Sequence, residues 1–293
     1  MGQSDLYHQR INAVIDHIRT HLTDDLSLAA LAEIAYFSPF HFHRIFKTLT
    51  GETVADLTLR LRLERAVALL RSSRRMRVSA AALDSGFIST AHFSRVFKKR
   101  YGLSPSRWNR DAPLTESKIR QTMPDFPQYT EEELAAFQFD VSVREFPAVR
   151  LAYVRVTDSF APERVLAGHD RLMAWHTARG GKPTTLIGMS QDDPDVTPPE
   201  LCRYDFCLIV PPDFQGDGDI SARDFPACHL ASVAVCGDIY LVDQVWQFLF
   251  RRWLPNSRFQ PDNLPAMEIY RRWPHEIGWE TFDLECAIPI RAL

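Results

Sequence analysis

The amino-acid sequence carries one ten-residue pattern twice, at an offset of 51 positions. Residues 38–47 read S-P-F-H-F-H-R-I-F-K, and residues 89–98 read S-T-A-H-F-S-R-V-F-K. The apolar residues of both copies follow the i, i+3, i+4 spacing of one helical face, and the basic residues fall largely on the other face. The serine that opens each copy is a typical N-cap, and the glycine that follows each copy (Gly51, Gly102) is a typical helix stop. Each copy is therefore predicted to form an amphipathic helix with a basic outer face.

A shorter helical segment precedes each copy, at 28–35 and 81–85, and a tight turn separates the two. Helix, tight turn and second helix make a helix-turn-helix unit, which the sequence predicts at about 26–48 and again at about 78–100. Residues 54–70 are predicted to form one helix between the two units. Its length of roughly 26–29 Å is near the ~34 Å that separates successive turns of one DNA groove.

Charge divides the chain into two parts of opposite sign. Residues 1–115 hold 17 basic and 10 acidic residues, a net charge of +7, whereas residues 116–293 hold 17 and 27, a net charge of −10. Nucleic acid is the default partner of such a basic part, although two unrelated solvated surfaces would give the same charges. No apolar run approaches the roughly 20 residues of a membrane span. The N-terminus also lacks the pattern of a signal peptide, so we expect a cytoplasmic protein without a membrane partner.

All five cysteines lie in the acidic part. Their number is odd and no C-x-x-C occurs, which argues against a disulfide framework. The closest pair, Cys202 and Cys207, lacks a second pair at the spacing of a zinc site. The sequence therefore predicts neither a metal site nor a cofactor.

The acidic part contains a second repeat, at an offset of 79 positions. Residues 144–148 (R-E-F-P-A) parallel residues 223–227 (R-D-F-P-A), and alternating apolar residues after each copy predict a strand. Each strand leads into a helical segment and two further strand-like runs. The first copy covers 149–156, 162–179, 184–190 and 204–210, and the second covers 228–235, 241–254, 267–272 and 281–290. We therefore predict a duplicated β-α-β-β unit, with a groove between its two helices because pockets favour such internal interfaces.

The basic part, from about residue 11 to residue 108, resembles the DNA-binding domain of the AraC/XylS transcription regulators. The matching pieces are L-S-L-A-A-L-A-E-I-A at 26–35, the copy at 38–47, and G-F-I-S-T-A-H-F-S-R-V-F-K-K-R-Y-G-L-S-P-S at 86–106. Tyr36 departs from the family, which often has glycine at this turn position. The resemblance implies double-stranded DNA as a partner, with RNA polymerase as a further partner.

The resemblance also assigns base-reading positions to the first turns of each second helix, which enters the major groove in such proteins. These positions are Phe40, His43 and Arg44 in the first unit and Thr90, Ala91 and Arg95 in the second. Arginine suits guanine and apolar groups suit the thymine methyl, whereas contact with phosphate alone is the alternative for Arg44 and Arg95. Lys47, Lys98 and Lys99 are expected to contact phosphates or to form a solvated face.

Residues 139–291 resemble the GyrI-like small-molecule-binding domain, which is also the effector domain of Rob-type and BmrR-type regulators. The carrying residues include L-I-G at 186–188, D-D-P at 192–194, T-P-P-E at 197–200, C-R-Y-D at 202–205 and M-E-I-Y at 267–270. The chain has Gly-Asp-Ile at 237–239, where the family often has Gly-Pro-Tyr. The resemblance implies that this part binds a small organic effector.

Glu268 stands between two apolar residues of a predicted strand, where a carboxylate is costly to bury unless it is paired. Strand alternation places Tyr270 on the same face, and the resemblance implies that Glu268 is the acid of the family's pocket. Trp246 on the second helix and Trp175 on the first are candidates for the walls, with a place in the core as the alternative for Trp175. Aromatic walls beside one acid suit lipophilic cations.

The predicted architecture has three segments. Residues 1–110 form an all-α DNA-binding domain with tandem helix-turn-helix units, residues 111–138 form a linker with a short helix at 131–137, and residues 139–293 form an α+β domain. The predicted function is a sequence-specific transcription regulator whose C-terminal domain senses a small organic effector, with cations as one candidate class. The alternative is a ligand-degrading hydrolase fused to a DNA-binding domain, because some GyrI-like domains are hydrolases with a pocket Glu. The sequence offers no Ser-His-Asp or metal constellation for catalysis, so we expect no enzyme.

Overall fold

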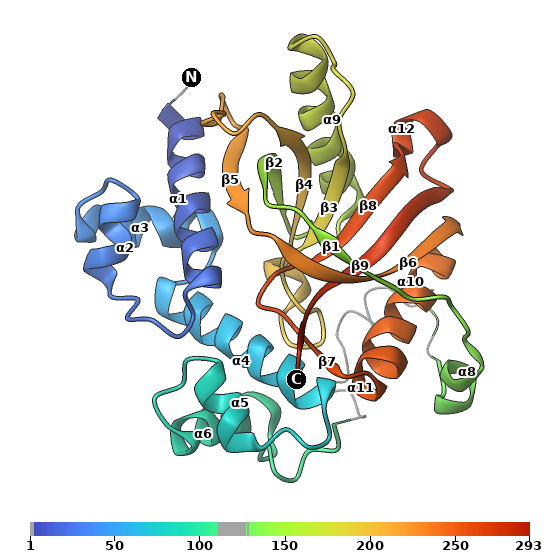
Figure 1. Cartoon of the computed structure of the whole chain (residues 1–293). Helices are drawn as coiled ribbons and strands as arrows, with labels where there is room; N and C mark the ends of the chain where they lie inside the picture. Colours follow the sequence, from blue (N-terminus) through green and yellow to red (C-terminus); the bar gives the residue numbers. More distant parts are fainter. Residues whose placement is uncertain (1–2, 111–126, 128) are drawn as a thin grey trace.

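The computed structural model describes residues 3–110, 127 and 129–293 (Figure 1). The N-terminal part consists of α1 (Gln3–Thr20), α2 (Leu28–Ile34), α3 (Pro39–Thr50), α4 (Val54–Ser72), α5 (Val78–Asp84) and α6 (Thr90–Tyr101). The pairs α2–α3 and α5–α6 are the two predicted helix-turn-helix units, and α4 connects them. The short helix predicted at 131–137 is α8 (Glu131–Ala136). Most of the predicted linker, residues 111–126 and 128, lies outside the described residues.

The ends of α3 and α6 follow from the residues that the two copies share. The Ser38 and Ser89 side-chain oxygens accept hydrogen bonds from the backbone N–H groups of His41 and His92, as N-caps do. Gly51 and Gly102 end the helices with φ of 78° and 77°, in the left-handed region that glycine adopts without steric cost. α3 and α6 therefore begin and end where the sequence predicts.

Each helix-turn-helix unit has its own hydrophobic core, and α4 contributes to both. Phe42 and Phe46 of α3 pack with α1, α2 and the N-terminal half of α4. Phe93 and Phe97 of α6 pack with α5 and the C-terminal half of α4. Because α4 serves two cores and also faces the sheet, most of its residues are buried.

The C-terminal part is built on one antiparallel sheet of nine strands. Its strands are β1 (Ser142–Phe146), β2 (Val149–Thr157), β3 (Leu186–Ser190), β4 (Arg203–Val210), β5 (Ser221–Phe225), β6 (Cys228–Gly237), β7 (Phe259–Pro261), β8 (Ala266–Arg272) and β9 (Phe282–Ala292). The order across the sheet is β1-β6-β9-β8-β3-β4-β2-β5, with β7 beside β9. The helical elements are α9 (Pro162–Ala178), a 3₁₀ turn (Pro199–Leu201), α10 (Ile239–Phe248), a π-helical turn (Leu249–Trp253), α11 (Leu254–Asn256) and α12 (Pro274–Ile277).

The strand order is symmetric about the central β3–β8 pair, as expected for a duplicated β-α-β-β unit. The R-E-F-P-A and R-D-F-P-A pieces were predicted only as markers of the repeat, but their first residues form the additional strands β1 and β5. β1 pairs with β6 of the second copy, and β5 pairs with β2 of the first copy. The strand that precedes each copy therefore pairs with the other copy. The rings of Phe146 and Phe225 pack edge to face, with their centroids 5.9 Å apart.

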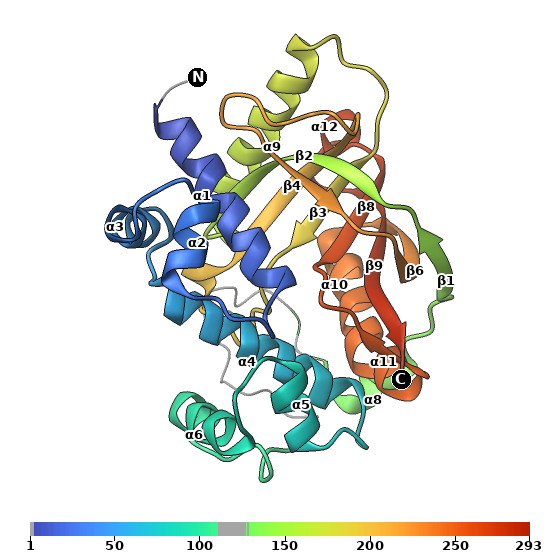
Figure 2. The same cartoon turned by 60° about the vertical axis from the view of Figure 1, so that its left-hand side comes forward.

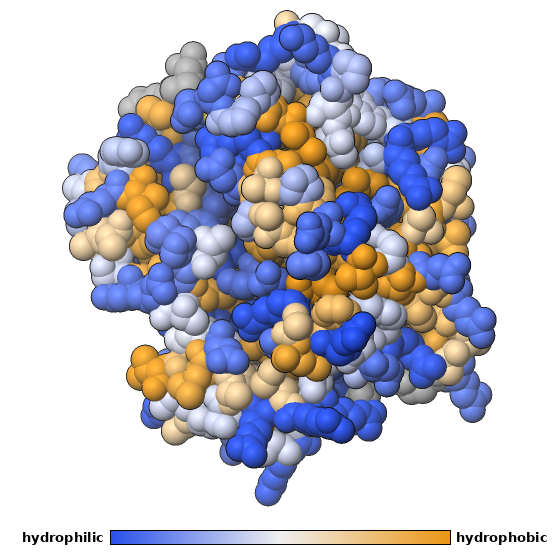
Figure 3. Space-filling view, viewed as in Figure 1, coloured by the Kyte–Doolittle hydropathy of each residue, from blue (hydrophilic) through white to orange (hydrophobic). Residues whose placement is uncertain are grey.

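Helices cover one face of the sheet. Leu172 of α9 and Val242 and Val245 of α10 pack against that face in the largest hydrophobic core. The opposite face has a second core, and α1 lies at its β5 end, where Asn12 donates to the Ser221 hydroxyl at 3.0 Å. Figure 3 shows hydrophobic residues in the middle of one face of the molecule and at its lower-left edge, with hydrophilic residues over much of the remaining rim. No helix in the described ranges combines the length and the apolar character that a membrane span requires.

Candidate nucleic-acid interface and effector site

The α3 side chains that were predicted to meet DNA all face solvent. Phe40, His43, Arg44 and Lys47 are exposed, and Phe40 keeps 69% of its surface accessible. This orientation follows from the buried Phe42 on the opposite side of the helix. The Arg44 guanidinium lies 5.9 Å from the Phe40 ring centroid. One face of α3 therefore presents the apolar Phe40 together with the basic side chains of Arg44 and Lys47.

The same face recurs on α6 with different chemistry. Ala91, Arg95, Lys98 and Lys99 are exposed, whereas Thr90 is half-buried next to the N-cap. Ala91 replaces Phe40 at the offset of 51, while Arg95 and Lys98 repeat Arg44 and Lys47. Figures 1 and 2 place α3 and α6 on the side of the helical part that points away from the sheet. The two basic faces are therefore open to a large ligand at the same time.

Glu268 lies at the centre of a cluster on the helix-covered face of the sheet. The Tyr204 hydroxyl donates to Oε2 of Glu268 at 2.5 Å, and the Tyr270 hydroxyl donates to the same oxygen at 3.4 Å. The Trp246 indole N–H donates to Oε1 at 3.3 Å, and the Trp246 ring stacks on Phe250. Glu268 itself is half-buried. The structure thus brings three of the four predicted effector residues together and adds Tyr204.

Burial and the neighbouring Glu268 carboxylate raise the pKa values of Tyr204 and Tyr270 well above the ordinary value. Both hydroxyls therefore stay protonated and act as donors at neutral pH. The cluster can present a carboxylate with fixed donors and an aromatic side chain to a ligand. Such a set suits a cation or a group rich in hydrogen-bond donors.

Gly188 makes the approach of Tyr204 to Glu268 possible. It lies directly opposite Glu268 in the β3–β8 register. A Cβ atom at position 188 would lie 1.6 Å from the Tyr204 hydroxyl oxygen, far closer than two such atoms can come. The absence of a side chain therefore leaves the space that the Tyr204 hydroxyl occupies.

Trp175 of α9 has a different environment. Its indole N–H donates to Asp217 at 3.0 Å, its ring packs on Phe214 at 5.4 Å, and Arg179 lies over it. Phe214 follows the C-terminal end of β4, whereas Tyr204 lies near its start. The contacts of Trp175 are therefore at the other end of β4 from the Glu268 cluster.

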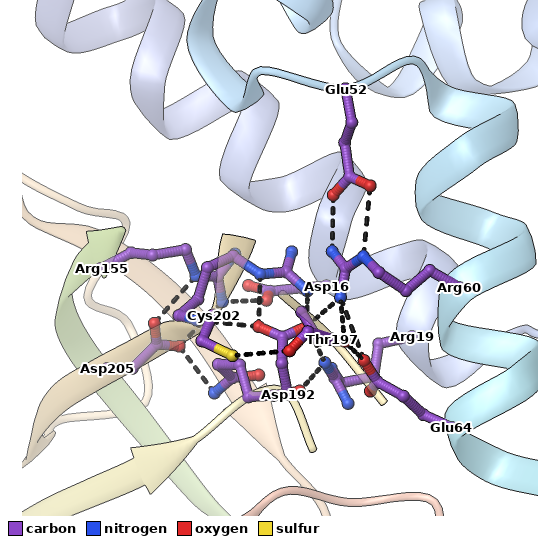
Figure 4. Close-up of polar contacts among 12 residues, drawn as sticks. Asp16, Arg19, Glu52, Arg60, Glu64, Arg155, Asp192, Thr197, Cys202 and Asp205 are labelled. Carbon is purple, nitrogen blue, oxygen red and sulfur yellow. Dashed lines mark hydrogen bonds and ion pairs between the residues drawn. The ribbon is translucent and has the colours of Figure 1, made fainter. Parts of the chain in front are cut away.

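A buried network of charges joins the helical part to the sheet, and the sequence analysis did not identify it (Figure 4). The fully buried Asp192 accepts from Arg60 of α4 at 2.7 Å and from both arms of Arg203 at 2.5 and 2.8 Å. Arg60 also binds Glu52 and Glu64. The arginines outweigh the cost of burial, so the pKa of Asp192 is lowered and the group is ionised.

A second hub of the network is Asp16 of α1. It accepts from the Tyr153 hydroxyl at 2.6 Å, from Arg155 at 2.6 Å and from Arg223 at 3.0 Å. Both arginines also bind the buried Asp205 of β4. Burial alone would raise the pKa of Asp16, but Arg155 and Arg223 lower it to about 2. The pairs that join the helical part to the sheet are far apart in sequence, so no local pattern could have predicted them.

Comparison with known proteins agrees with both halves of this description. Residues 139–291 match the GyrI-like small molecule binding domain, and residues 31–111 match a helix-turn-helix domain. The first match covers more than half of the chain, which therefore belongs to the GyrI-like family. The helical part is an AraC-type helix-turn-helix region, as the resemblance at positions 26–106 indicated.

The similar curated proteins include several that are named as transcriptional regulators. An uncharacterized HTH-type transcriptional regulator of Haemophilus influenzae is 36% identical over 109 residues, which cover 37% of this chain and 36% of that protein. The probable regulator LumQ of Photobacterium leiognathi is 34% identical and shares 34% of this chain and 41% of its own length. The chain thus spans less than half the length of these two relatives. It spans 92% of the regulatory protein SoxS of Escherichia coli, at 32% identity over 34% of this chain.

Two solved structures are also similar to parts of the chain. The C-terminal domain of EcmrR matches 54% of this chain and all of that domain, with 14% identity and a TM-score of 0.42. The DNA-binding domain of AdpA in complex with a target DNA matches 40% of this chain and 97% of that domain, with 27% identity and a TM-score of 0.33.

Proposed function

We propose that this chain is a sequence-specific DNA-binding transcription regulator whose GyrI-like part senses a small organic cation. The proposed division is 1–110 for DNA binding and 139–293 for the effector, joined by 111–138. The observation that carries the DNA-binding role is the pair of exposed basic faces on α3 and α6, which repeat Arg44 as Arg95 and Lys47 as Lys98. RNA polymerase is proposed as the further partner because transcription is the process that such a regulator controls.

The effector class follows from the Glu268 cluster. A carboxylate among Tyr204, Tyr270 and Trp246 attracts a positive charge, and the aromatic rings provide apolar contact for the organic body of the ligand. Glu268 is half-buried, so part of this residue stays accessible. A lipophilic aromatic cation satisfies both features, whereas an anion would meet the repulsion of Glu268.

The DNA-binding role is tested by selection of duplexes from a random library with the full chain, followed by footprinting. We expect one asymmetric site, protected in two successive major grooves and bound by a single chain, because the two recognition helices differ in sequence. An inverted-repeat site that requires two chains would contradict this arrangement. Failure to enrich any sequence over the starting library would contradict sequence-specific binding.

The effector role is tested by calorimetric titration of tetraphenylphosphonium into the full chain and into Glu268→Gln. The change keeps the shape and removes the charge, so we expect an affinity loss of about tenfold or more. Glu280→Gln, at an exposed position, is the matched control and should bind as the parent does. Equal binding by Glu268→Gln with an intact fold would reject the electrostatic role. Steady conversion of the ligand by the parent, absent in Glu268→Gln, would favour the hydrolase alternative.

A further inference from the structure

The segment between β3 and β4, residues 191–202, reaches from the sheet to α1 and α4 and into the second helix-turn-helix unit. We name it the bridging loop. Its first contacts are with α1 and the N-terminal half of α4, which pack with the first helix-turn-helix unit. Asp192 binds Arg60 at 2.7 Å and approaches Arg19 of α1 at 3.5 Å. The Thr197 hydroxyl accepts from Arg60 at 2.9 Å and donates to Glu64.

The tip of the same loop is part of the second unit. Val196 is 3% exposed and belongs to the core that contains Phe97 and Tyr101 of α6. Its backbone carbonyl accepts from Arg100 of α6 at 3.3 Å. On either side of Val196, the carboxylates of Asp193 and Asp195 pair with Arg71 at the end of α4, at 3.7 and 3.0 Å. The loop therefore completes a core that the residues of the second unit do not fill alone.

Both ends of the bridging loop belong to strands of the effector site. Gly188, which faces Glu268, lies in β3 three positions before the loop begins. After the loop, β4 begins with Arg203, which holds Asp192, and continues with Tyr204, which donates to Glu268. Neighbouring residues of a strand point to opposite faces of the sheet. Arg203 belongs to the charge network and Tyr204 to the effector site, so a single peptide bond connects the two.

We propose that the bridging loop fixes the position of α6 relative to α3, and that occupancy of the Glu268 site changes this position. The loop thereby determines which spacing between two DNA contact sites the chain accepts. This inference rests on the proposed function for its DNA and effector consequences. Its structural part, the control of the relative position of the two helices, does not require either ligand.

Some buried polar atoms of the charge network at the base of the loop lack a hydrogen-bond partner. Among the described residues, Arg19 Nε, Arg155 Nη1 and Arg223 Nε are buried donors without an acceptor, and Gln191 Oε1 is a buried acceptor without a donor. Buried groups without partners are unfavourable, and they recover hydrogen bonds with water when an interface opens. An arrangement that contains them is therefore easier to leave than a fully satisfied one.

The structural part is tested by double electron–electron resonance on the full chain without DNA. Nitroxide labels are placed at Lys47→Cys on α3 and Lys98→Cys on α6, in a background with the exposed Cys236 changed to Ser. We expect one narrow distance distribution for the parent. Val196→Ser, which removes the apolar tip, should broaden or shift the distribution. Val143→Ser makes the same change at an exposed position on β1 and should leave it unaltered.

A second variant keeps the test decisive if Val196→Ser disturbs folding. Arg71→Gln breaks the pairs with Asp193 and Asp195 at the partly exposed edge of the loop, and circular dichroism reports whether the fold is kept. A broadened distribution in folded Arg71→Gln supports the proposal. An unchanged distance distribution in folded Arg71→Gln and in folded Val196→Ser overturns the proposal. The loop would then fill the core without fixing the position of α6.

The ligand-dependent parts have separate readouts. Tetraphenylphosphonium should move the distance distribution of the parent and leave that of Glu268→Gln in place. On the selected DNA site, insertion of one base pair between the two contact regions should weaken the parent by about tenfold and the Arg71→Gln variant clearly less. If the cation binds without moving the distance, the coupling is wrong. If no cation or no DNA binds, the proposed function fails while the effect of Arg71→Gln still decides the role of the loop.

Discussion

The Arg60 guanidinium and the Asp192 carboxylate lie 2.7 Å apart, although 132 positions separate them in the chain. Both side chains are buried, at 9% and 0% exposure. Removal of one partner would change the charge balance of a network in a medium of low polarity, although Asp192 would keep Arg203 and Arg60 would keep Glu52 and Glu64. The helical part and the sheet are therefore joined by a buried ionic contact whose removal should lower the stability of the chain.

The two basic residues at the same position of successive turns in α6 should behave differently in DNA binding. Arg95→Ala should weaken binding to the selected site by about 1–3 kcal/mol if Arg95 reads a base. Lys98→Ala should weaken all sequences alike and reduce the slope of log K against log salt by about 1. Fluorescence anisotropy on selected and random duplexes measures both. Lys182→Ala, an exposed lysine of the C-terminal part, serves as the control, and equal losses of Arg95→Ala on both duplexes would reduce Arg95 to a phosphate contact.

Substitutions at equivalent turn positions of the two units are expected to change the stability of the chain in opposite directions. Tyr36 has φ 53° and Gly86 has φ 84°, and both follow the short first helix of their unit. Tyr36→Gly should stabilise the chain by about 1 kcal/mol, because a non-glycine residue in this region is strained. Gly86→Ala should destabilise it by several times as much, because its Cβ would lie 2.0 Å from the Leu22 carbonyl oxygen. Urea unfolding measures both, and a stabilised Gly86→Ala variant would contradict the geometry.

The raised pKa of Glu64 predicts that its contribution to the free energy of unfolding falls as pH rises. Burial and the nearby Asp192 raise the pKa of Glu64 from 4.5 to about 7, against the attraction of Arg60 and Arg19. A folded-state pKa above the unfolded value contributes stability below about pH 4.5 that is lost as pH rises through 7, up to roughly 3 kcal/mol. Glu64→Gln mimics the protonated form, so its Tm should be close to that of the parent at pH 4 and exceed it at pH 8. The exposed Glu33→Gln should show no such divergence, and parallel curves for Glu64→Gln would refute the shift.

The lowered pKa of Asp16 predicts that its contribution to stability falls as pH decreases. Its pKa is lowered from 3.8 to about 2, so its contribution is complete above pH 3.8 and is lost as pH falls through 2. Asp16→Asn leaves Arg155 and Arg223 with Asp205 as their remaining carboxylate. We expect a loss of about 3–5 kcal/mol at pH 7. Chemical unfolding measures this loss, with the exposed Asp25→Asn as the control; a loss below 1 kcal/mol, near what a surface ion pair contributes, would show that the network tolerates the missing charge.

Much of the candidate site could be predicted from the sequence because its signals are local. The apolar spacing around Phe42 and Phe93 determines which sides of α3 and α6 are buried, and therefore that Arg44 and Arg95 face solvent. Alternation along 267–270 places Glu268 and Tyr270 on one face of β8. Tyr204 was not identified because its contact with Glu268 depends on the pairing of β3 with β8 and on the space above Gly188. No spacing within one segment reports that pairing.

The sequence by itself determined the two repeats, the helices with their serine caps and glycine ends, and the β-α-β-β pattern, because propensity, periodicity and capping act between residues that are close in the chain. Only the tertiary structure decided that β1 and β5 are exchanged between the two copies and that Trp175 lies away from Glu268. It also decided that the bridging loop inserts Val196 into the second unit. Those features arise from contacts between distant residues, whose free energy is set by burial and charge in the assembled molecule rather than by any local pattern.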